Sequence, residues 1–361
     1  MNIAFLGRQW LPHTFERMNG LKANGHNVYF FSWPMEKNIN HKNLYLLPFP
    51  FSLKLKNLIR YFIPNVLYVR KLIRKYNIKV VHVMGIVNGI YALFLFPAKV
   101  IIEHNGSDIL LFPQKYWYYK LYYKLIYPFC SGIIQDSDVS KQAGIKIGAP
   151  TKNNEIIDIG VDFNYFNPNI KKGFIRKKYN IGKNQKIVFH ARGSRELYNS
   201  DIIIKSIPNV KKVFPDVIYF FAGYYDENNP YQKIVKKLNV QKNVIFLGKI
   251  DRLRMLPKYY IDSNLVISIP SSDSSPLSVY ETMACMTPII LSKLPWLDLK
   301  FSNHDYMSVE PRDSISLSKK IIEALTSPDL CNTKELYNVV LNDINTINET
   351  KKLEKFYSNL F

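Results

Sequence analysis

Residues 271–290, SSDSSPLSVYETMACMTPII, decide the fold, because they lead from one apolar run into another through a loop and a helix. The run before them, residues 265–269 (LVISI), does not alternate apolar with polar positions, which is typical of a strand buried in a parallel sheet. The order strand, loop, helix, strand predicts one unit of an α/β domain.

The predicted helix has recognisable ends. Ser274 or Ser275 is a good N-cap, and Pro276 suits the first helical position, where its missing N–H costs nothing. The helix should extend to about Met286, since Pro288 prevents it from continuing.

The start of this helix is a candidate diphosphate-binding site. Free backbone N–H groups near Ser275, Leu277 and Ser278 would point out of the carboxyl edge of the sheet, where ligands of α/β proteins bind. Asp273 precedes the helix, and Glu281 lies little more than one turn inside it. Because phosphate repels carboxylates, we expect both to accept hydrogen bonds from sugar or ribose hydroxyls. The alternative is that Glu281 is a solvated helix residue and Asp273 a capping group of the loop.

The whole string resembles the signature of family 4 glycosyltransferases, in which an acidic residue, seven intervening residues and a Glu precede a Met-Ala-Cys-Gly-x-Pro-type helix end. Here Asp273 and Glu281 have this spacing, and the segments 283–285 (MAC) and 288–290 (PII) follow. The first acidic residue is Asp where Glu is commoner, and Met286 stands where the family usually has Gly. A left-handed helix cap at Met would be strained.

The segment 186–199 (KIVFHARGSRELYN) predicts another strand and loop, followed by a helix from about residue 200 to 214. In the family, an Arg and a Lys in this loop bind the donor diphosphate. This chain has Arg192 and Arg195 instead, and Arg192 with the following Tyr198 is similar to another version of the pattern. A guanidinium binds phosphate through a fork of two N–H groups, so two arginines suit this role, although whether Arg195 replaces the Lys stays open.

Two glycines stand at predicted strand ends, where backbone can approach a nucleotide. Gly7 follows the first strand, residues 2–6, and Gly223 follows the strand at 217–222. By resemblance to the family, the loop that Gly7 opens approaches donor and acceptor.

The segment 100–110 (VIIEHNGSDIL) reads as a strand followed by a polar turn. It is similar to the family's His-Gly-Ser-Asp-Ile-Leu segment, with Asn105 as an additional or substituted residue. The resemblance implies that His104 lies beside the donor sugar and Asp108 near the acceptor. The alternative is a strand-end histidine whose ring is satisfied by backbone.

The composition is that of a globular protein: the 361 residues include 47% hydrophobic and 21% charged side chains, enough for two α/β domains. The three cysteines are far apart, so we expect neither a disulfide framework nor a zinc site.

The N-terminus leads directly into a strand, unlike a signal peptide. The apolar region 80–102 is broken by His82, Asn88 and Pro97, which favours strand, helix and strand over a membrane span. A cytoplasmic protein is expected.

The formal net charge of +21 requires a partner, and residues 1–160 contain 20 Lys and Arg against 8 Asp and Glu. Basic residues are mixed with aromatic ones at 54–62, 70–76 and 115–124. This mixture suits the interface of an anionic bilayer and predicts a peripheral protein on the inner face of the cell membrane. The alternatives are solvated helix faces and nucleic acid, although the sequence has no recognised nucleic-acid module and none is expected as a partner.

The domain boundary should lie near Pro168, because residues 163–168 (FNYFNP) look like the family's link between domains. We therefore expect an acceptor-side domain at 1–168, a nucleotide-sugar-binding domain at 169–340, and a C-terminal helix at 341–361 that returns to the first domain.

Together these features predict two doubly wound, Rossmann-like α/β domains facing a cleft, the GT-B fold. The resemblance implies a retaining, hexosyltransferase-type enzyme of bacterial or archaeal cell-surface polysaccharide or glycolipid synthesis. It would move a sugar from a nucleotide diphosphate sugar to a hydroxyl of a lipid-linked or polysaccharide acceptor. His104, Asp273 and Arg192 are the candidate catalytic residues. No Asp-x-Asp donor motif of the metal-dependent kind is identified, so neither a metal nor another cofactor is expected. The alternatives are a sugar-nucleotide epimerase and a non-catalytic nucleotide-binding protein.

Overall fold

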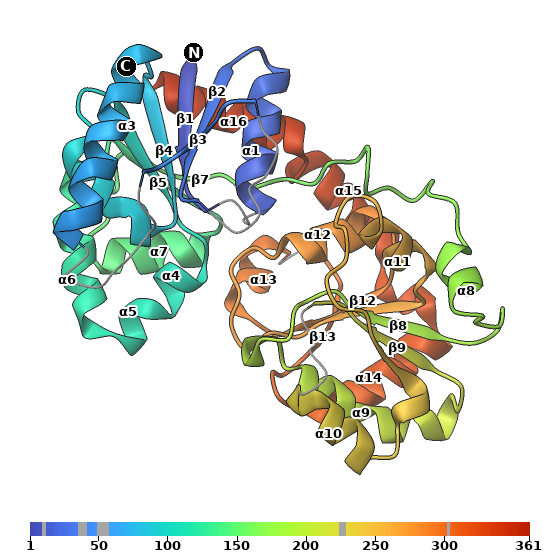
Figure 1. Cartoon of the computed structure of the whole chain (residues 1–361). Coiled ribbons are helices and arrows are strands. Elements are labelled where there is room, and N and C mark those ends of the chain that lie inside the picture. The colour runs from blue at the N-terminus through green and yellow to red at the C-terminus, as the bar shows by residue number, and fades with distance from the viewer. Residues whose placement is uncertain (9–11, 35–41, 49–57, 224–228, 302–303) are drawn as a thin grey trace. The chain divides into compact units, whose positions relative to one another are not determined.

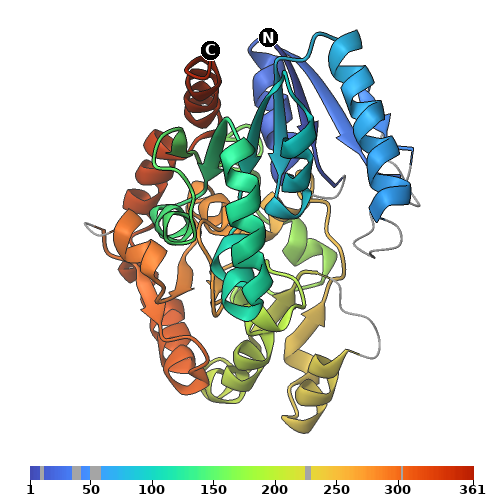
Figure 2. The ribbon, with the colours of Figure 1, turned by 90° about the vertical axis from the view of Figure 1, so that its left-hand side faces the viewer.

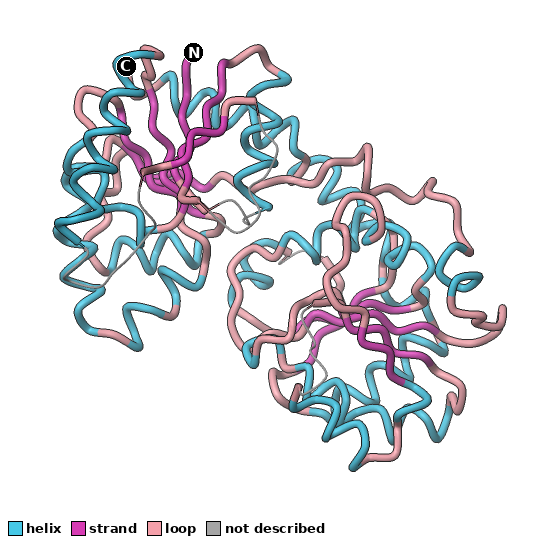
Figure 3. The backbone as a smooth tube through the Cα atoms, viewed as in Figure 1, coloured by secondary structure: helices cyan, strands magenta, loops and turns pink. Residues whose placement is uncertain are grey.

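The computed structural model describes residues 1–8, 12–34, 42–48, 58–223, 229–301 and 304–361, and the chain forms two compact units (Figure 1). Unit 1 comprises Met1–Ile159 and Thr346–Phe361, and unit 2 comprises Gly160–Asn345. Each unit has one sheet of parallel strands with helices packed on it (Figure 3). The prediction of two doubly wound α/β domains is confirmed.

The sheet of unit 1 has seven strands in the order β3-β2-β1-β4-β5-β6-β7. Its central strands are apolar and buried on both faces, as expected for a parallel sheet covered on both sides. The strands are β1 Asn2–Leu6, β2 Asn27–Ser32, β3 Leu44–Leu46, β4 Val80–Met84, β5 Lys99–Glu103, β6 Gly132–Gln135 and β7 Asn154–Ile156.

Two hydrophobic cores lie on the two faces of this sheet, one under α3 and α6 and the other under α1 and α16. The helices of unit 1 are α1 Pro12–Ala23, α3 Ile63–Lys75, α4 Ser107–Leu110, α5 Phe112–Lys115, α6 Trp117–Ile126, α7 Asp138–Lys146 and α16 Thr346–Ser358, with a π-helical turn at Leu58–Phe62 and 3₁₀ helices at Ile86–Phe94 and Tyr127–Phe129. The apolar region 80–102 thus forms strand, helix and strand. Among the described residues, no helix has the length and apolar character needed to span a bilayer.

The sheet of unit 2 has six strands in the order β10-β9-β8-β11-β12-β13. The strands are β8 Ile187–His190, β9 Ile218–Phe221, β10 Val244–Phe246, β11 Leu265–Ser268, β12 Ile289–Ser292 and β13 Met307–Val309. The helices are α8 Phe174–Lys178, α9 Ser200–Val213, α10 Pro230–Lys237, α11 Leu256–Asp262, α12 Leu277–Ala284, α13 Pro295–Lys300, α14 Ser314–Thr326 and α15 Thr333–Asp343, with 3₁₀ helices at Glu196–Tyr198, Gln241–Asn243 and Pro328–Cys331.

The boundary between the units lies at Ile159 and Gly160, earlier in the chain than the predicted position near Pro168. The physical reason is that the segment after Gly160 packs on unit 2. Phe166 is fully buried with its ring centre 6.2 Å from that of Tyr260, and the N–H of Val161 donates to the carbonyl of Ile344 at 2.8 Å. The return to unit 1 comes at Thr346, and α16 packs on α1.

In both sheets the strand order reverses at one point. In unit 1 the chain builds outward in opposite directions from β1 and β4, and in unit 2 from β8 and β11. Loops that follow two such neighbouring strands turn away from each other and leave a space between them at the carboxyl edge, where α/β proteins bind ligands. Most predicted site residues of unit 2 lie in the loop after β8 or in the loop and helix α12 after β11, and Gly223 follows β9.

Candidate active site

Arg192 lies in the loop after β8, and its guanidinium reaches the loop after β11. Its Nη2 is 2.9 Å from Oδ2 of Asp273, and its Nη1 donates to Oγ of Ser278 at 3.2 Å. The guanidinium carbon is 4.4 Å from the ring centre of Tyr198, within cation–π range. Both charged side chains of the ion pair are only 14% exposed. Residues predicted from two separate sequence motifs therefore form one cluster.

This cluster can bind both an anion and a sugar. A guanidinium has five N–H donors, of which Asp273 and Ser278 occupy part, so Arg192 retains donors for phosphate oxygens. Asp273 retains acceptor positions for hydroxyl groups because a carboxylate has about four lone-pair sites. The ion pair also fixes the position of the Asp273 carboxylate beside the guanidinium.

The N-terminus of α12 lies in the same place, but its cap differs from the prediction. Pro276 is the N-cap residue, with extended φ of −77° and ψ of 109°, and no described side chain caps the helix. The predicted serine cap is wrong, because the Oγ of Ser275 bonds instead with the hydroxyl of Tyr280 at 2.8 Å. The first N–H groups of a helix have no partner within the helix, so those of Leu277 and Ser278 suit an anionic ligand.

Glu281 is held by two residues that the sequence reasoning did not identify. Arg252 approaches its Oε1 with Nε at 2.7 Å and Nη2 at 2.6 Å, and the hydroxyl of Tyr260 donates to Oε2 at 3.1 Å. The alternative of a solvated helix residue is wrong, because Glu281 is 1% exposed. Arg252 follows β10 without any motif around it, so spacing alone gave no signal for it.

Arg195 and Gly223 lie close to the cluster for different reasons. The guanidinium carbon of Arg195 is 5.8 Å from the Tyr198 ring that Arg192 also contacts. Gly223 has φ of +126°, and a Cβ there would meet the Cα of Gly193 at 2.5 Å, so two loops pack directly through these glycines. A Cβ at Gly193 itself would meet no atom within 4 Å, which leaves the backbone of that loop open to a ligand.

His190, the last residue of β8, links the end of this strand to β11 and α9. Its Nδ1 lies 3.0 Å from the carbonyl of Ile267 in β11, and its Nε2 lies 3.3 Å from Oγ of Ser200 at the start of α9. Burial lowers the pKa of His190 to about 4, so the ring is neutral at physiological pH. These two contacts fix the position at which the loop that carries Arg192 begins.

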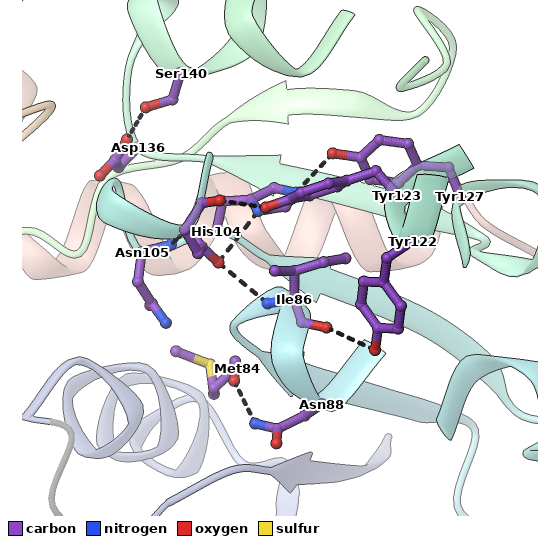
Figure 4. A network of polar contacts seen from close by, with 11 residues as sticks. Met84, Ile86, Asn88, His104, Asn105, Tyr122, Tyr123, Tyr127, Asp136 and Ser140 are labelled. Carbon is purple, nitrogen blue, oxygen red and sulfur yellow. Dashed lines mark hydrogen bonds and ion pairs between the residues drawn. The ribbon is translucent and has the colours of Figure 1, made fainter. Parts of the chain in front are cut away.

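In unit 1, His104 and Asp108 form a buried pair. The rings of Tyr123 and Tyr127 lie beside His104 (Figure 4). The Nδ1 of His104 is 3.3 Å from Oδ2 of Asp108, and its Nε2 is 3.2 Å from the hydroxyl of Tyr127. Asp108 also accepts from the backbone N–H groups of Ile86 at 3.1 Å and Asn105 at 2.8 Å. Both ring nitrogens of His104 are thus engaged by side chains, and the alternative of a ring satisfied by backbone is wrong.

Gly7 is required by packing at the end of β1. A Cβ on it would come within 3.0 Å of the Cβ of Met84, at the end of the neighbouring strand β4. The loop that Gly7 opens continues through residues 9–11, which lie outside the described residues.

A second buried polar cluster in unit 1 joins four elements. Glu103 at the end of β5 contacts Arg17 of α1 at 3.2 Å and His82 of β4 at 2.9 Å. His82 also bonds the hydroxyl of Tyr357 in α16. Burial alone would raise the pKa of Glu103, but the charge of Arg17 and the contact with His82 outweigh it and lower the pKa to about 2. These groups join α1, β4, β5 and α16 and have a structural role.

Comparison with known families identifies both units. Residues 171–336 match the family "Glycosyl transferases group 1", and residues 2–137 match the family "Glycosyl transferase 4-like". Each unit is therefore similar to a glycosyltransferase family. The first match spans the Arg192, Asp273 and Glu281 cluster, and the second spans the His104 and Asp108 pair.

Solved structures of low sequence identity share the GT-B fold of this chain. Sucrose-phosphate synthase from Thermosynechococcus elongatus is 18% identical with a TM-score of 0.82, covering 100% of this chain and 99% of that one. HepE of Anabaena, in complex with UDP and glucose, is 15% identical with a TM-score of 0.80, covering 99% and 100%.

One curated relative is N-acetyl-alpha-D-glucosaminyl L-malate synthase of Bacillus anthracis, 23% identical over 158 residues. That match covers 43% of this chain and spans 40% of the length of the relative.

Proposed function

We propose that this glycosyltransferase moves a hexose from a nucleotide diphosphate sugar to an acceptor hydroxyl, with retention of anomeric configuration. The observation that carries the proposal is the cluster of Arg192, Asp273 and Ser278 at the uncapped N-terminus of α12, one turn from Glu281. This arrangement offers a diphosphate site with carboxylates beside it.

In this proposal each group answers one need of the reaction. Glu281 accepts hydrogen bonds from the ribose, and Asp273 accepts them from the sugar hydroxyls. Arg192, Arg195 and the N–H groups of Leu277 and Ser278 stabilise the charge that develops on the β-phosphate as the bond to the sugar breaks. Fixed cations and a helix N-terminus supply this stabilisation without a metal ion.

The reaction retains the configuration when both bonds change on one face of the sugar. The bond from the anomeric carbon to the β-phosphate oxygen breaks, the acceptor oxygen bonds to the same face, and its proton passes to the departing diphosphate. No protein nucleophile is assigned. His104, predicted to be catalytic, is assigned here to positioning Asp108 on the acceptor side, because both of its ring nitrogens are engaged.

The uridine nucleotide is the first donor class to test, because the structure of HepE, which has the same fold, contains UDP and glucose. The acceptor in this proposal is lipid-linked or a growing polysaccharide of the cell surface, and the enzyme works in the cytoplasm at the inner face of the membrane. The excess of basic residues in 1–160 supports that location.

The test is nucleotide release across a panel of UDP-, GDP-, ADP- and dTDP-sugars, with anionic vesicles present and with EDTA in parallel. The wild type is compared with Glu281→Gln, which keeps the shape of the buried side chain, and with Arg192→Met. We expect one nucleotide to be released, undiminished by EDTA, and Arg192→Met to lower kcat about 100-fold, the size of effect typical of one lost oxyanion donor. The matched control is Glu323→Gln, in a surface ion pair with Lys320.

Three results separate the alternatives. Nucleotide binding without turnover favours a non-catalytic binding protein. Conversion of a sugar nucleotide to its epimer, without transfer, favours an epimerase. Turnover that is equal in wild type and Arg192→Met contradicts the proposed site.

A further inference from the structure

One face of unit 1, formed by α3, the 3₁₀ helix Ile86–Phe94 and α6, carries large apolar side chains that are exposed. We call it the α3–α6 face. Its apolar members are 40% to 82% exposed: Ile63, Leu67, Phe94, Phe96, Trp117, Tyr118, Leu121 and Leu125. Single exposed apolar residues are ordinary on protein surfaces, but a group on neighbouring elements marks an interaction site.

These elements form one layer over the sheet. Their buried sides share a single hydrophobic core, and the rings of Phe62 and Phe94 lie 5.5 Å apart. The hydroxyl of Tyr122 in α6 accepts from the N–H of Ile90 at 3.0 Å and donates to the carbonyl of Ile86 at 3.2 Å. Figure 2 looks onto this side of unit 1, where α3 and α6 both face the viewer.

The exposed residues of α6 follow a helical stripe. Trp117, Leu121 and Leu125 recur every four residues and are 73%, 58% and 54% exposed. Lys120 and Lys124 are exposed beside them. An apolar stripe flanked by lysines whose stems can extend along it is the pattern of a helix lying in a membrane interface.

The charge of this face has one sign. The sequence contains no Asp or Glu between Glu36 and Glu103, and none between Asp108 and Asp136. The cations of α3, α6 and the residues beside them are Arg60, Arg70, Lys71, Arg74, Lys75, Lys115, Lys120 and Lys124. A face with eight cations and no acidic side chain of its own complements an anionic surface.

We propose that the α3–α6 face docks on an anionic lipid bilayer, with the Trp117, Leu121 and Leu125 stripe inserted among the headgroups and the surrounding cations paired with lipid phosphates. The exposed leucines and tryptophan favour a bilayer over nucleic acid, which would use the cations but leave the apolar stripe in water. The inference extends the proposed function, which names a membrane-linked acceptor. Docking is measured without donor or acceptor, so the two proposals fail separately.

The first experiment is co-sedimentation of the full chain with phosphatidylglycerol-containing vesicles and with phosphatidylcholine vesicles at low and high salt. We expect binding to the anionic vesicles that weakens with salt. Trp117 is an internal reporter: its fluorescence should shift to shorter wavelength on binding. Trp33 and Trp296 are 4% and 3% exposed and already shielded, and Trp10 lies outside the described residues. Trp117→Phe should keep the sedimentation and lose most of the shift.

Paired variants test the two parts of the face. Lys120→Gln with Lys124→Gln should weaken binding about 25-fold, at about fivefold for each lysine near the surface. Leu121→Ser with Leu125→Ser should weaken it at least tenfold. The controls are Lys319→Gln with Lys334→Gln, and Ile315→Ser, all exposed positions of unit 2, which should bind as wild type does.

Two results would overturn the proposal. One is that the wild type binds anionic and neutral vesicles equally, or binds neither, while circular dichroism shows that the proteins are folded. The other is a dimer in analytical ultracentrifugation that the Leu121→Ser and Leu125→Ser pair dissociates, which would assign the face to a second copy of the chain.

Discussion

At the scale of single residues, the two carboxylates of the candidate site each face an arginine from a different loop. Asp273 is paired with Arg192, and Glu281 with Arg252. Both arginines come from loops that follow other strands, so the positions of the carboxylates depend on the sheet. Each ion pair therefore fixes the orientation of its carboxylate before a ligand arrives.

Arg252→Lys tests whether Arg252 positions Glu281 for a ribose. Lysine keeps the charge but loses the double contact of Nε and Nη2 with Oε1, so we expect UDP to bind about tenfold more weakly. Inorganic pyrophosphate lacks a ribose, and its affinity should be unchanged. Calorimetric titration measures both, with the exposed Arg254→Lys as control. An equal loss for both ligands would contradict the ribose role.

The sequence predicted both residues of the Arg192 and Asp273 pair, but only Glu281 of the pair that Glu281 forms with Arg252. Asp273, Ser278 and Glu281 lie in one continuous motif, and Arg192 follows a recognisable strand, so local spacing was sufficient. Arg252 and Tyr260 contact Glu281 only because strands β10 and β11 return the chain to the same edge. Likewise, the network that engages both ring nitrogens of His104 requires Tyr127, which lies on a separate turn.

At the scale of elements, α12 ends in a conformation that its sequence does not favour. Met286 has φ of +51°, the left-handed cap that was predicted to be strained. The bounds of the helix, Leu277–Ala284, lie within those predicted from Pro276 and Pro288. The strain arises because the chain must turn directly into β12, whatever residue stands there.

Met286→Gly should therefore stabilise unit 2 by about 1 kcal/mol, since glycine adopts this conformation without a Cβ clash. The urea midpoint of unfolding measures the gain. Asn239→Gly is a matched control, because Asn239 also has positive φ, at 53°, but asparagine tolerates it. A gain at Asn239 as large as at Met286 would argue against strain as the cause.

The Arg17 and Glu103 pair joins α1 to β5, so it acts between elements. Arg17→Met should destabilise unit 1 by about 3–5 kcal/mol, because Glu103 is left as a buried charge without its main partner. The double variant Arg17→Met with Glu103→Gln should recover part of the loss. Urea unfolding at neutral pH gives both values, and equal stability of the single and double variants would contradict this account.

The same pair predicts a pH dependence. The folded pKa of Glu103, about 2, lies below its ordinary value of 4.5, so the unfolded chain binds the proton more readily. The stabilisation is therefore fully present above about pH 4.5 and is lost as the pH falls towards 2. Between pH 4.5 and pH 2, the free energy of unfolding should fall less in the Arg17→Met with Glu103→Gln variant than in the wild type, because that variant has no carboxyl group at residue 103 to take up a proton.

At the scale of the whole molecule, unit 1 is completed by the last helix of the chain. Leu353, Phe356 and Tyr357 of α16 join Phe5 and Met18 in one buried core. Leu353→Ala should cost about 2–5 kcal/mol and lower the unfolding temperature of unit 1, as measured by calorimetry. Leu341→Ala in unit 2, where the side chain is 38% exposed, should cost much less. Similar losses in the two variants would contradict the role of α16.

The chain passes from one unit to the other twice, between Ile159 and Gly160 and between Asn345 and Thr346. Val161 and Asn345, next to the two boundaries, are bridged in parallel, so the segment 160–345 begins and ends at one place. A segment with adjacent ends can be exchanged as a cassette without stretching its host. Under the proposed function, in which the site in unit 2 binds the donor, recombination at these two points would pair a new donor specificity with an unchanged first unit in a single step.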